Sequence, residues 1–267
     1  MITLMKNMAG MIMTNTIMMN SHAESMNDKT AGTNTLSGVK KDLLSQQIAT
    51  LMWLSSPALP VGGFSFSEGL EQAIERKVVK DGDSLRQCLE DAVRYGLMRW
   101  DLPLLKLLYR ASCKEDRSEF ERLDARLLSG RGTKELCEED RATGSALIRL
   151  LKALDKFPSW ADGLHPGYIS ALAICGAQTL PVCQESCQGL MLSFLMSWAQ
   201  NQVSAAIKAV PLGQNRGQQV LVSLIPFFED SVLQVMDRQD PPVGVSLPAH
   251  AILSSLHEVQ YSRLFRS

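Results

Sequence analysis

A chain of 267 residues with 45% hydrophobic and 21% charged residues has the composition of an ordinary globular protein and can bury a sizeable core. Its formal net charge of -1 and pI near 6.4, without any run of Lys or Arg, argue against bulk attraction to nucleic acid or to an anionic membrane surface. The six cysteines are scattered, which argues against a disulfide framework and favours a reducing, cytoplasmic setting.

The first 41 residues form a methionine-rich segment with many threonines and asparagines. A secretory signal peptide is one interpretation, with Lys6 as its basic region and Ser21-His22-Ala23 as a poor cleavage site. The polar residues Thr14-Asn15-Thr16 interrupt its apolar stretch, however, and the segment has no strong periodicity. We therefore expect a disordered, flexible extension over residues 1–41.

From Leu43 onward the apolar residues recur at helical spacing. One helix is expected to start at a capping box of Ser84 and Gln87. Another is expected to run as far as Phe157, before Pro158. A long helix is expected over residues 182–210, and no convincing strand is found. The predicted fold class is all-α, a single helical-bundle-like domain of about eight to ten helices over residues 42–238.

Two stretches without formal charge, residues 163–184 and 186–207, resemble membrane spans only in length. The first is interrupted by Pro166 and Pro181, and the second carries several Gln and Asn side chains. Polar amides and prolines at these positions argue against a membrane span. Both stretches are therefore expected in the core of the domain.

Residues 55–71 form an elaborate loop between two predicted helices. Pro57 and Pro60 stop the first helix, and Gly62-Gly63 permits backbone angles that other residues avoid. Ser65 and Glu68 have the spacing of a capping box that restarts a helix. The loop is either a plain connector with phenylalanines plugged into the core or a functional surface.

A second loop follows the long predicted helix. Pro211 is expected to end that helix, and Gly213 is expected to supply a left-handed turn. Polar side chains from Gln214 to Gln219 then crowd the start of the next helix. Such a cluster is either solvated surface or a partner site, and from its chemistry alone we favour solvated surface.

Residues 239–267 are expected to form a linker and a C-terminal tail, because the Pro-Pro-Val-Gly run at 241–244 cannot continue a helix. The end of the chain places aromatic and aliphatic residues beside arginines, from Gln260 to Ser267. Such a segment either docks on a partner or folds back onto its own core.

The sequence nominates no catalytic group, no metal site and no cofactor. There is no G-x-x-x-x-G-K-[ST] loop for a nucleotide, and the four histidines have no metal-binding spacing. Cys183 and Cys187, one helical turn apart, are the best candidates for metal ligands, but buried thiols in a helix use the same spacing.

Three segments together resemble the urease accessory protein family UreF. The pattern S-P-A-L-P-x-G-x-[FY]-S-x-S-x-G-L-E is matched by residues 56–71, V-P-L-G-Q by residues 210–214, and H-E-x-x-Y-S-R-L-F-R-S by residues 257–267. Asp101-Leu102-Pro103, and Arg141 with Gly144, are also similar. Phe66 departs from the pattern, since the family often has Tyr or His there, and the resemblance does not cover the methionine-rich extension.

The resemblance implies an all-helical, often dimeric protein without enzymatic activity. Such a protein bridges UreD (UreH) and the GTPase UreG on apo-urease (UreABC) and couples GTP hydrolysis to nickel insertion. The nucleotide and the nickel ligands would then belong to UreG. Two alternatives remain: a catalytic activator of the UreG GTPase that inserts an arginine such as Arg216, and a metal carrier that uses Cys183 and Cys187.

The resemblance also implies candidate partner-binding residues. Those for UreG or for a second copy of the chain are Gly62, Phe64, Ser65, Ser67, Glu68, Glu71, Lys208, Gln214, Arg216 and Gln218. Those for UreD are His257, Glu258, Tyr261, Arg263, Leu264 and Phe265, which favours the docking interpretation of the tail.

Overall fold

The computed structural model describes the backbone of residues 33–238 and 248–266. Most of the predicted extension, residues 1–32, lies outside this range, as do residues 239–247 of the predicted linker. The chain divides into two units, Met1–Leu44 and Ser45–Ser267. In the first unit the described residues 33–44 form the start of helix α2 (Thr33–Leu54), so this helix begins inside the segment predicted to be disordered.

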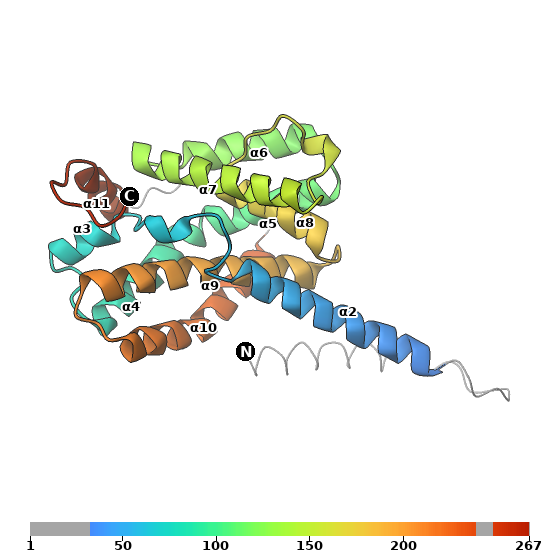
Figure 1. Cartoon of the computed structure of the whole chain (residues 1–267), viewed down its shortest axis with the longest axis horizontal. Coiled ribbons are helices and arrows are strands. Elements are labelled where there is room, and N and C mark those ends of the chain that lie inside the picture. Colours follow the sequence, from blue (N-terminus) through green and yellow to red (C-terminus); the bar gives the residue numbers. More distant parts are fainter. Residues whose placement is uncertain (1–32, 239–247, 267) are drawn as a thin grey trace. The chain divides into compact units, whose positions relative to one another are not determined.

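The described residues contain ten α-helices and no strand, which confirms the predicted all-α fold (Figure 1). Three short turns accompany them, η1 (Gly63–Ser65), the π-helical turn η2 (Val93–Leu97) and η3 (Ser159–Ala161). After α2 the helices are α3 (Leu70–Glu75), α4 (Gly82–Ala92), α5 (Asp101–Cys113), α6 (Arg117–Ser129), α7 (Lys134–Ala153), α8 (Tyr168–Thr179), α9 (Gln184–Ala209), α10 (Gln214–Asp237) and α11 (Pro248–Glu258).

Helices α5 and α8 form the centre of the second unit. Four leucines of α5 have no exposed surface (Leu102, Leu104, Leu105 and Leu108), and α8 is buried continuously from Ile169 to Gly176. A helix that is apolar around its whole circumference is stable only when other helices surround it. Accordingly, α5 packs against α6, α8, α9 and α10, and α8 also packs against α7.

The long helix predicted over residues 182–210 is confirmed as α9, Gln184–Ala209. Its first backbone amides are capped by the Cys183 side chain, whose sulfur accepts from Ser186 N, and it ends where Val210 turns extended before Pro211. The prediction for Gly213 is wrong. Its φ of -65° and ψ of 152° make it an extended N-cap of α10 instead of a left-handed turn.

Two predicted helix ends are also wrong, because local side-chain and backbone hydrogen bonds outweigh the apolar period. Helix α4 starts after Asp81, whose carboxylate accepts from Ser84 N at 2.8 Å, so Ser84 is the third residue of the helix. Helix α7 stops at Ala153, before Phe157. There Lys156 N donates back to Leu151 O, with Asp155 at a φ of 53°, as in a Schellman motif.

A buried lysine holds the C-terminal end of α10. Lys106 on α5 donates from Nζ to the carbonyls of Val235 at 3.2 Å, Met236 at 2.7 Å and Arg238 at 3.1 Å. Carbonyls at the end of a helix have no partner inside the helix. The positive charge of the lysine also interacts favourably with the negative end of the helix dipole. The point at which the chain leaves α10 is therefore fixed to the core.

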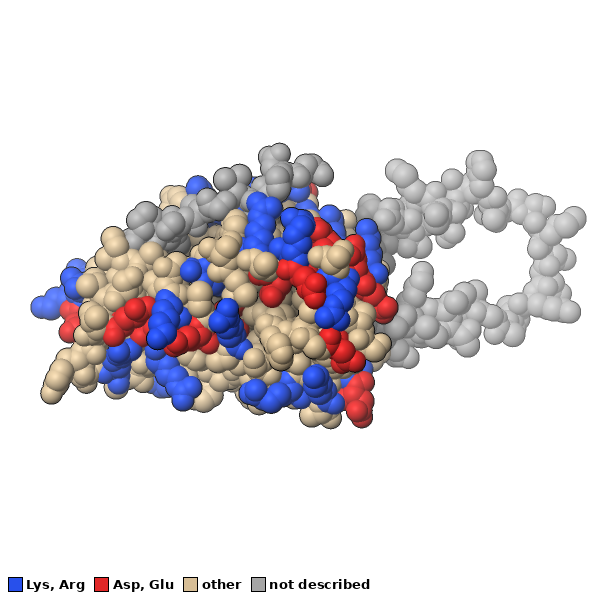
Figure 2. Space-filling view, turned by 90° about the horizontal axis from the view of Figure 1, so that it is seen from above, with Lys and Arg blue, Asp and Glu red and all other residues tan. Residues whose placement is uncertain are grey.

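Among the described residues, α10 is the one helix whose length and composition would allow it to cross a membrane. It contains Pro226 and packs against α4, α5 and α9, which places it in the core of the second unit. On the face shown in Figure 2, Lys and Arg side chains alternate with Asp and Glu, so neither sign of charge forms a continuous patch there.

Candidate functional site

The loop between α2 and α3 contacts the C-terminal end of the chain. Gly62, at a φ of 79°, turns the backbone into η1. Ser65 O then accepts a hydrogen bond from Arg266 N at 2.8 Å. The neighbouring Phe64 side chain points outward with 61% of its surface exposed. The loop is therefore more than a connector, since it binds the tail on one side and presents an aromatic ring on the other.

The capping box predicted at Ser65 and Glu68 is wrong. Helix α3 begins only at Leu70, after Gly69 at a φ of 81°, and the structure shows no side-chain cap there. Glu68 turns away from the helix, and its carboxylate accepts a hydrogen bond from the Trp198 indole at 3.1 Å. Ser67 is fully buried. Both polar side chains therefore point into the protein interior, where Glu68 binds Trp198.

Glu71, in the first turn of α3, receives hydrogen bonds from the tail. Its carboxylate accepts from Leu264 N at 2.9 Å and from Phe265 N at 3.1 Å. The amide of Gln260 donates to it at 3.3 Å, and His257 Nε2 lies 3.2 Å away. Successive backbone amides on one buried carboxylate fix the path of the tail, because charge-assisted hydrogen bonds are the strongest kind available.

Glu135, in the first turn of α7, holds the tail from the opposite side. One carboxylate oxygen is 2.8 Å from His257 Nδ1, and the other accepts from Arg263 Nη1 at 2.6 Å. The backbone amide of Glu135 in turn donates to the Glu258 carboxylate at 3.4 Å. The ring of His257, on α11, therefore lies between two glutamates that are distant in sequence.

The end of α9 completes the contact. Phe265 is buried, and the ammonium of Lys208 lies 5.5 Å from the centre of its ring, within cation–π distance. We name the whole arrangement the tail junction. It comprises Ser65, Glu71, Glu135, Lys208, His257, Arg263 and Phe265.

The structure thus brings together residues that the sequence assigned to different partners. Glu71 and Lys208, candidates for UreG or a second copy, contact candidates for UreD in the tail junction, and Ser65 contacts the neighbouring Arg266. For His257 and Phe265 the structure shows the folded-back interpretation of the tail. Docking of the tail on UreD stays a prediction for its exposed side chains, above all Tyr261 and Leu264, whose relative exposures are 106% and 68%.

The remaining candidates lie on the first turns of α10 and are exposed. Arg216 forms an ion pair with Asp83 of α4 at 2.6 Å. Gln214 and Gln218 line a surface hollow of about 380 Å³ between α9 and α10, together with apolar residues such as Val203 and Leu221. A hollow with uncharged polar and apolar walls suits a protein partner.

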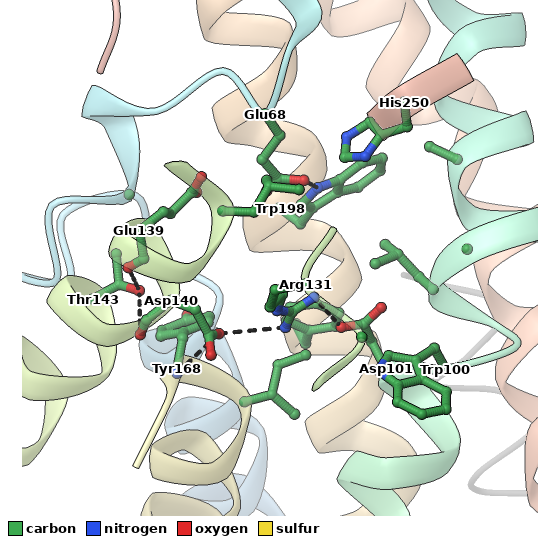
Figure 3. Close-up of a pocket in the computed structure, with 18 of the residues that line it drawn as sticks. Glu68, Trp100, Asp101, Arg131, Glu139, Asp140, Thr143, Tyr168, Trp198 and His250 are labelled. Atoms are coloured by element: carbon green, nitrogen blue, oxygen red, sulfur yellow. Dashed lines mark hydrogen bonds and ion pairs between the residues drawn. The ribbon is translucent and has the colours of Figure 1, made fainter. Parts of the chain in front are cut away.

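Sequence reasoning missed a cavity of about 170 Å³ between α5, α7, α9 and α11 (Figure 3). Arg131, in the loop before α7, extends into it between two carboxylates. Its guanidinium donates to Asp101 at 2.7 Å and to Asp140 at 3.3 Å. Glu68, Trp198 and His250 form the opposite wall of the cavity.

Burial dominates the electrostatics of this cavity. Desolvation raises the pKa of Glu68, while His250 and the Trp198 hydrogen bond oppose the shift. Desolvation likewise raises the pKa of Asp140 against the pull of Arg131. For Arg131, burial alone would lower the pKa, but Asp101 and Asp140 outweigh it and the net shift is upward. The cavity therefore keeps a guanidinium charged and favours the protonated form of Glu68.

Two polar atoms of the Asp101–Arg131–Asp140 ion triad lack a hydrogen bond within the described residues. Arg131 Nε and Asp140 Oδ2 are buried and have no hydrogen-bond partner among the described residues. No sequence pattern marked Arg131 or Asp140, which meet Asp101 only through the packing of α5 and α7. The similarity of Asp101-Leu102-Pro103 to the family pattern was the single available signal.

The cysteines proposed as metal ligands have other roles. Cys183 caps α9, and burial raises the pKa of the Cys187 thiol to about 11, which disfavours the thiolate that a metal requires. Within residues 44–238 and 250–266, no three His, Cys, Asp or Glu side chains are grouped so that they could hold a metal ion.

The model of the UreF family matches residues 79–225 of the chain. Among curated proteins, the urease accessory protein UreF of Chromohalobacter salexigens is 40% identical over 221 residues, which cover 82% of this chain and 94% of that protein. The UreF of Alkalilimnicola ehrlichii is 38% identical, over 81% of this chain and 94% of that protein. The UreF of Teredinibacter turnerae is 37% identical over 84% of this chain and the full length of that protein.

Proposed function

Because the chain belongs to the UreF family of urease accessory proteins, we propose that it acts as a non-enzymatic scaffold in urease maturation. In this role it joins UreD (UreH) and the GTPase UreG on apo-urease (UreABC) in the cytoplasm and couples GTP hydrolysis to nickel insertion. It works as a homodimer within that complex and needs no cofactor of its own.

The tail junction is the observation that carries this proposal. Hydrogen bonds fix the tail to the loop 61–69 and to Glu71 of α3, and a cation–π contact joins the tail to the end of α9. Around these contacts, exposed apolar side chains (Phe64, Tyr261 and Leu264) face solvent. Rigid, exposed aromatic and aliphatic anchors next to a packed core are typical of binding hot spots. We assign Tyr261 and Leu264 to UreD, and Phe64 to UreG.

The UreD contact is tested by substituting the exposed side chains of the seated tail. The double variant Tyr261→Ala, Leu264→Asp is expected to weaken UreD binding by about tenfold or more, since it removes two anchors and adds a charge. Its helical circular dichroism should equal that of the parent, because both side chains are exposed. Affinity is measured by pull-down and titration with purified UreD.

The matched control is Val182→Asp, which adds the same charge at an apolar side chain with 71% exposure just before α9. It should bind UreD like the parent chain. Equal affinity of the double variant and the control would reject the tail as the UreD contact. Loss of helical signal in the double variant would instead show that the tail supports the core.

The UreG contact is tested separately. Phe64→Asp is expected to abolish recruitment of UreG to the complex with UreD while UreD itself stays bound, because the exposed ring lies in the loop and not in the tail. Co-purification of all three proteins, with the two partners quantified independently, gives the readout. Full retention of UreG, or a parallel loss of UreD and UreG, would contradict this assignment.

Catalytic activation of the UreG GTPase is the alternative proposal, and Arg216 is its candidate residue. A surface ion pair such as that of Arg216 with Asp83 contributes little free energy, so the guanidinium is free to exchange partners. An arginine finger accelerates GTP hydrolysis by roughly 10³- to 10⁵-fold. Single-turnover hydrolysis by UreG, with and without the full chain, separates the scaffold from the activator.

A further inference from the structure

His257 occupies an unusual position for a titratable side chain. It lies near the end of α11 with none of its surface exposed, and each ring nitrogen faces a carboxylate oxygen. Nδ1 is 2.8 Å from Glu135, and Nε2 is 3.2 Å from Glu71. A neutral imidazole has one donor and one acceptor nitrogen, so it cannot donate to both oxygens.

At their other contacts within the described part of the chain, both glutamates accept from donors. The carboxylate of Glu71 accepts from Leu264 N, Phe265 N and the Gln260 amide. The carboxylate of Glu135 accepts from Arg263. A carboxylate surrounded by donors is favoured in its ionised form, because a protonated oxygen would have to give up one of these hydrogen bonds.

Two ionised carboxylates therefore leave both ring nitrogens as donors. We propose that Glu71, His257 and Glu135 form a proton-binding site, in which His257 is an imidazolium and the seating of the tail takes up its second proton. This inference concerns the isolated chain and does not depend on the partners proposed above.

Charge balance supports the site. With the proton bound, His257 and Arg263 neutralise Glu71 and Glu135. The other acidic group at the cluster is Glu258, whose carboxylate accepts from the backbone of Glu135. More distantly, Glu75 and Arg76 both hydrogen-bond to Gln72, which donates to Gln260. Without the proton, the buried groups would carry an excess negative charge, which is strongly unfavourable at low dielectric.

The proton is linked to the position of the tail. Glu71 binds the ring of His257 and also the backbone amides of Leu264 and Phe265. A proton that is bound when the tail is seated, and released when it is not, stabilises the seated form at low pH. The tail should therefore loosen as the pH rises through deprotonation of the ring.

The direct test is the ring ¹⁵N NMR spectrum of the full chain at about pH 8. A free histidine with a pKa of about 6.5 is almost entirely neutral there. Free histidine in the same buffer is the reference, with one protonated and one bare ring nitrogen. His257 should show two protonated nitrogens. A neutral ring at His257 under these conditions would overturn the proposal.

A variant tests the link to the tail. Glu135→Gln keeps the shape of the side chain but removes one acceptor charge, so His257 should lose its second proton at about pH 8. Hydrogen-exchange protection of the Leu264 and Phe265 amides should fall with it. Glu138→Gln, at an exposed glutamate of the same helix, should change neither signal. Unchanged protection in Glu135→Gln despite a neutral ring would refute the coupling.

Discussion

The Arg131→Met variant is expected to lose about 3–5 kcal/mol of unfolding free energy, because it leaves Asp101 and Asp140 buried without their counter-ion. Methionine replaces much of the volume of the arginine stem, so the loss would arise mainly from the uncompensated carboxylates. Both acids are nearly inaccessible to solvent, which prevents water from taking over the role of the guanidinium. Denaturant unfolding followed by circular dichroism measures the change.

Arg122→Met is the matched control. Arg122 pairs with Glu119 at 2.7 Å, a geometry as close as that of Arg131 with Asp101, but both side chains are largely exposed. An exposed pair of this kind contributes about 0–1 kcal/mol. Similar losses in the two variants would show that burial does not determine the strength of the Arg131 triad.

Gly144→Ala is expected to lose about 3 kcal/mol of unfolding free energy. Alanine normally stabilises a helix by about 1 kcal/mol relative to glycine, so helix propensity alone would predict that Gly144→Ala increases the stability. A Cβ at Gly144 would lie 2.4 Å from the carbonyl oxygen of Pro166 and 2.6 Å from the carbonyl carbon of Gly167. Both atoms belong to the backbone at the start of α8 and cannot move without separating α7 from α8.

Gly189→Ala on α9 provides the comparison, because its Cβ would also meet an atom at 2.6 Å. That atom is the terminal methyl of Leu51, which can rotate away, so we expect a change below about 1 kcal/mol. Thermal or denaturant unfolding of both variants tests the distinction. Equal losses would mean that the approach of α7 to the start of α8 is not the constraint on residue 144.

Apolar spacing predicted the helices well where burial alone decides the structure. The ends of α9 fall within two residues of the expected 182–210, because Pro211 and the apolar period coincide there. The ends of α4 and α7 were misplaced, since Asp81 and Lys156 form local hydrogen bonds that no period reveals. The prediction of a left-handed Gly213 was wrong because this residue is the extended N-cap of the helix that follows.

Most residues of the tail junction were predictable, Glu135 excepted, but their contacts were not. Family-like motifs marked Ser65, Glu71, Lys208 and the tail, yet nothing in the sequence indicated that these residues bind one another. The hydrogen bond from Phe265 N to Glu71 joins residues 194 positions apart. The Arg131 triad is similar, since Arg131 and Asp140 lie outside any motif and join Asp101 in a buried network only after α5 and α7 have packed.

The anchored end of α10 has a consequence for any protein that binds the tail. Lys106 fixes the chain at Arg238, and α11 resumes at Pro248, so the tail is tethered close to its own binding site. A short tether of this kind gives an intramolecular ligand an effective concentration in the millimolar range. A partner that needed the buried faces of His257 or Phe265 would have to compete against that concentration. A partner that binds the exposed Tyr261 and Leu264 does not have to displace the tail, and the residues that it binds are already ordered.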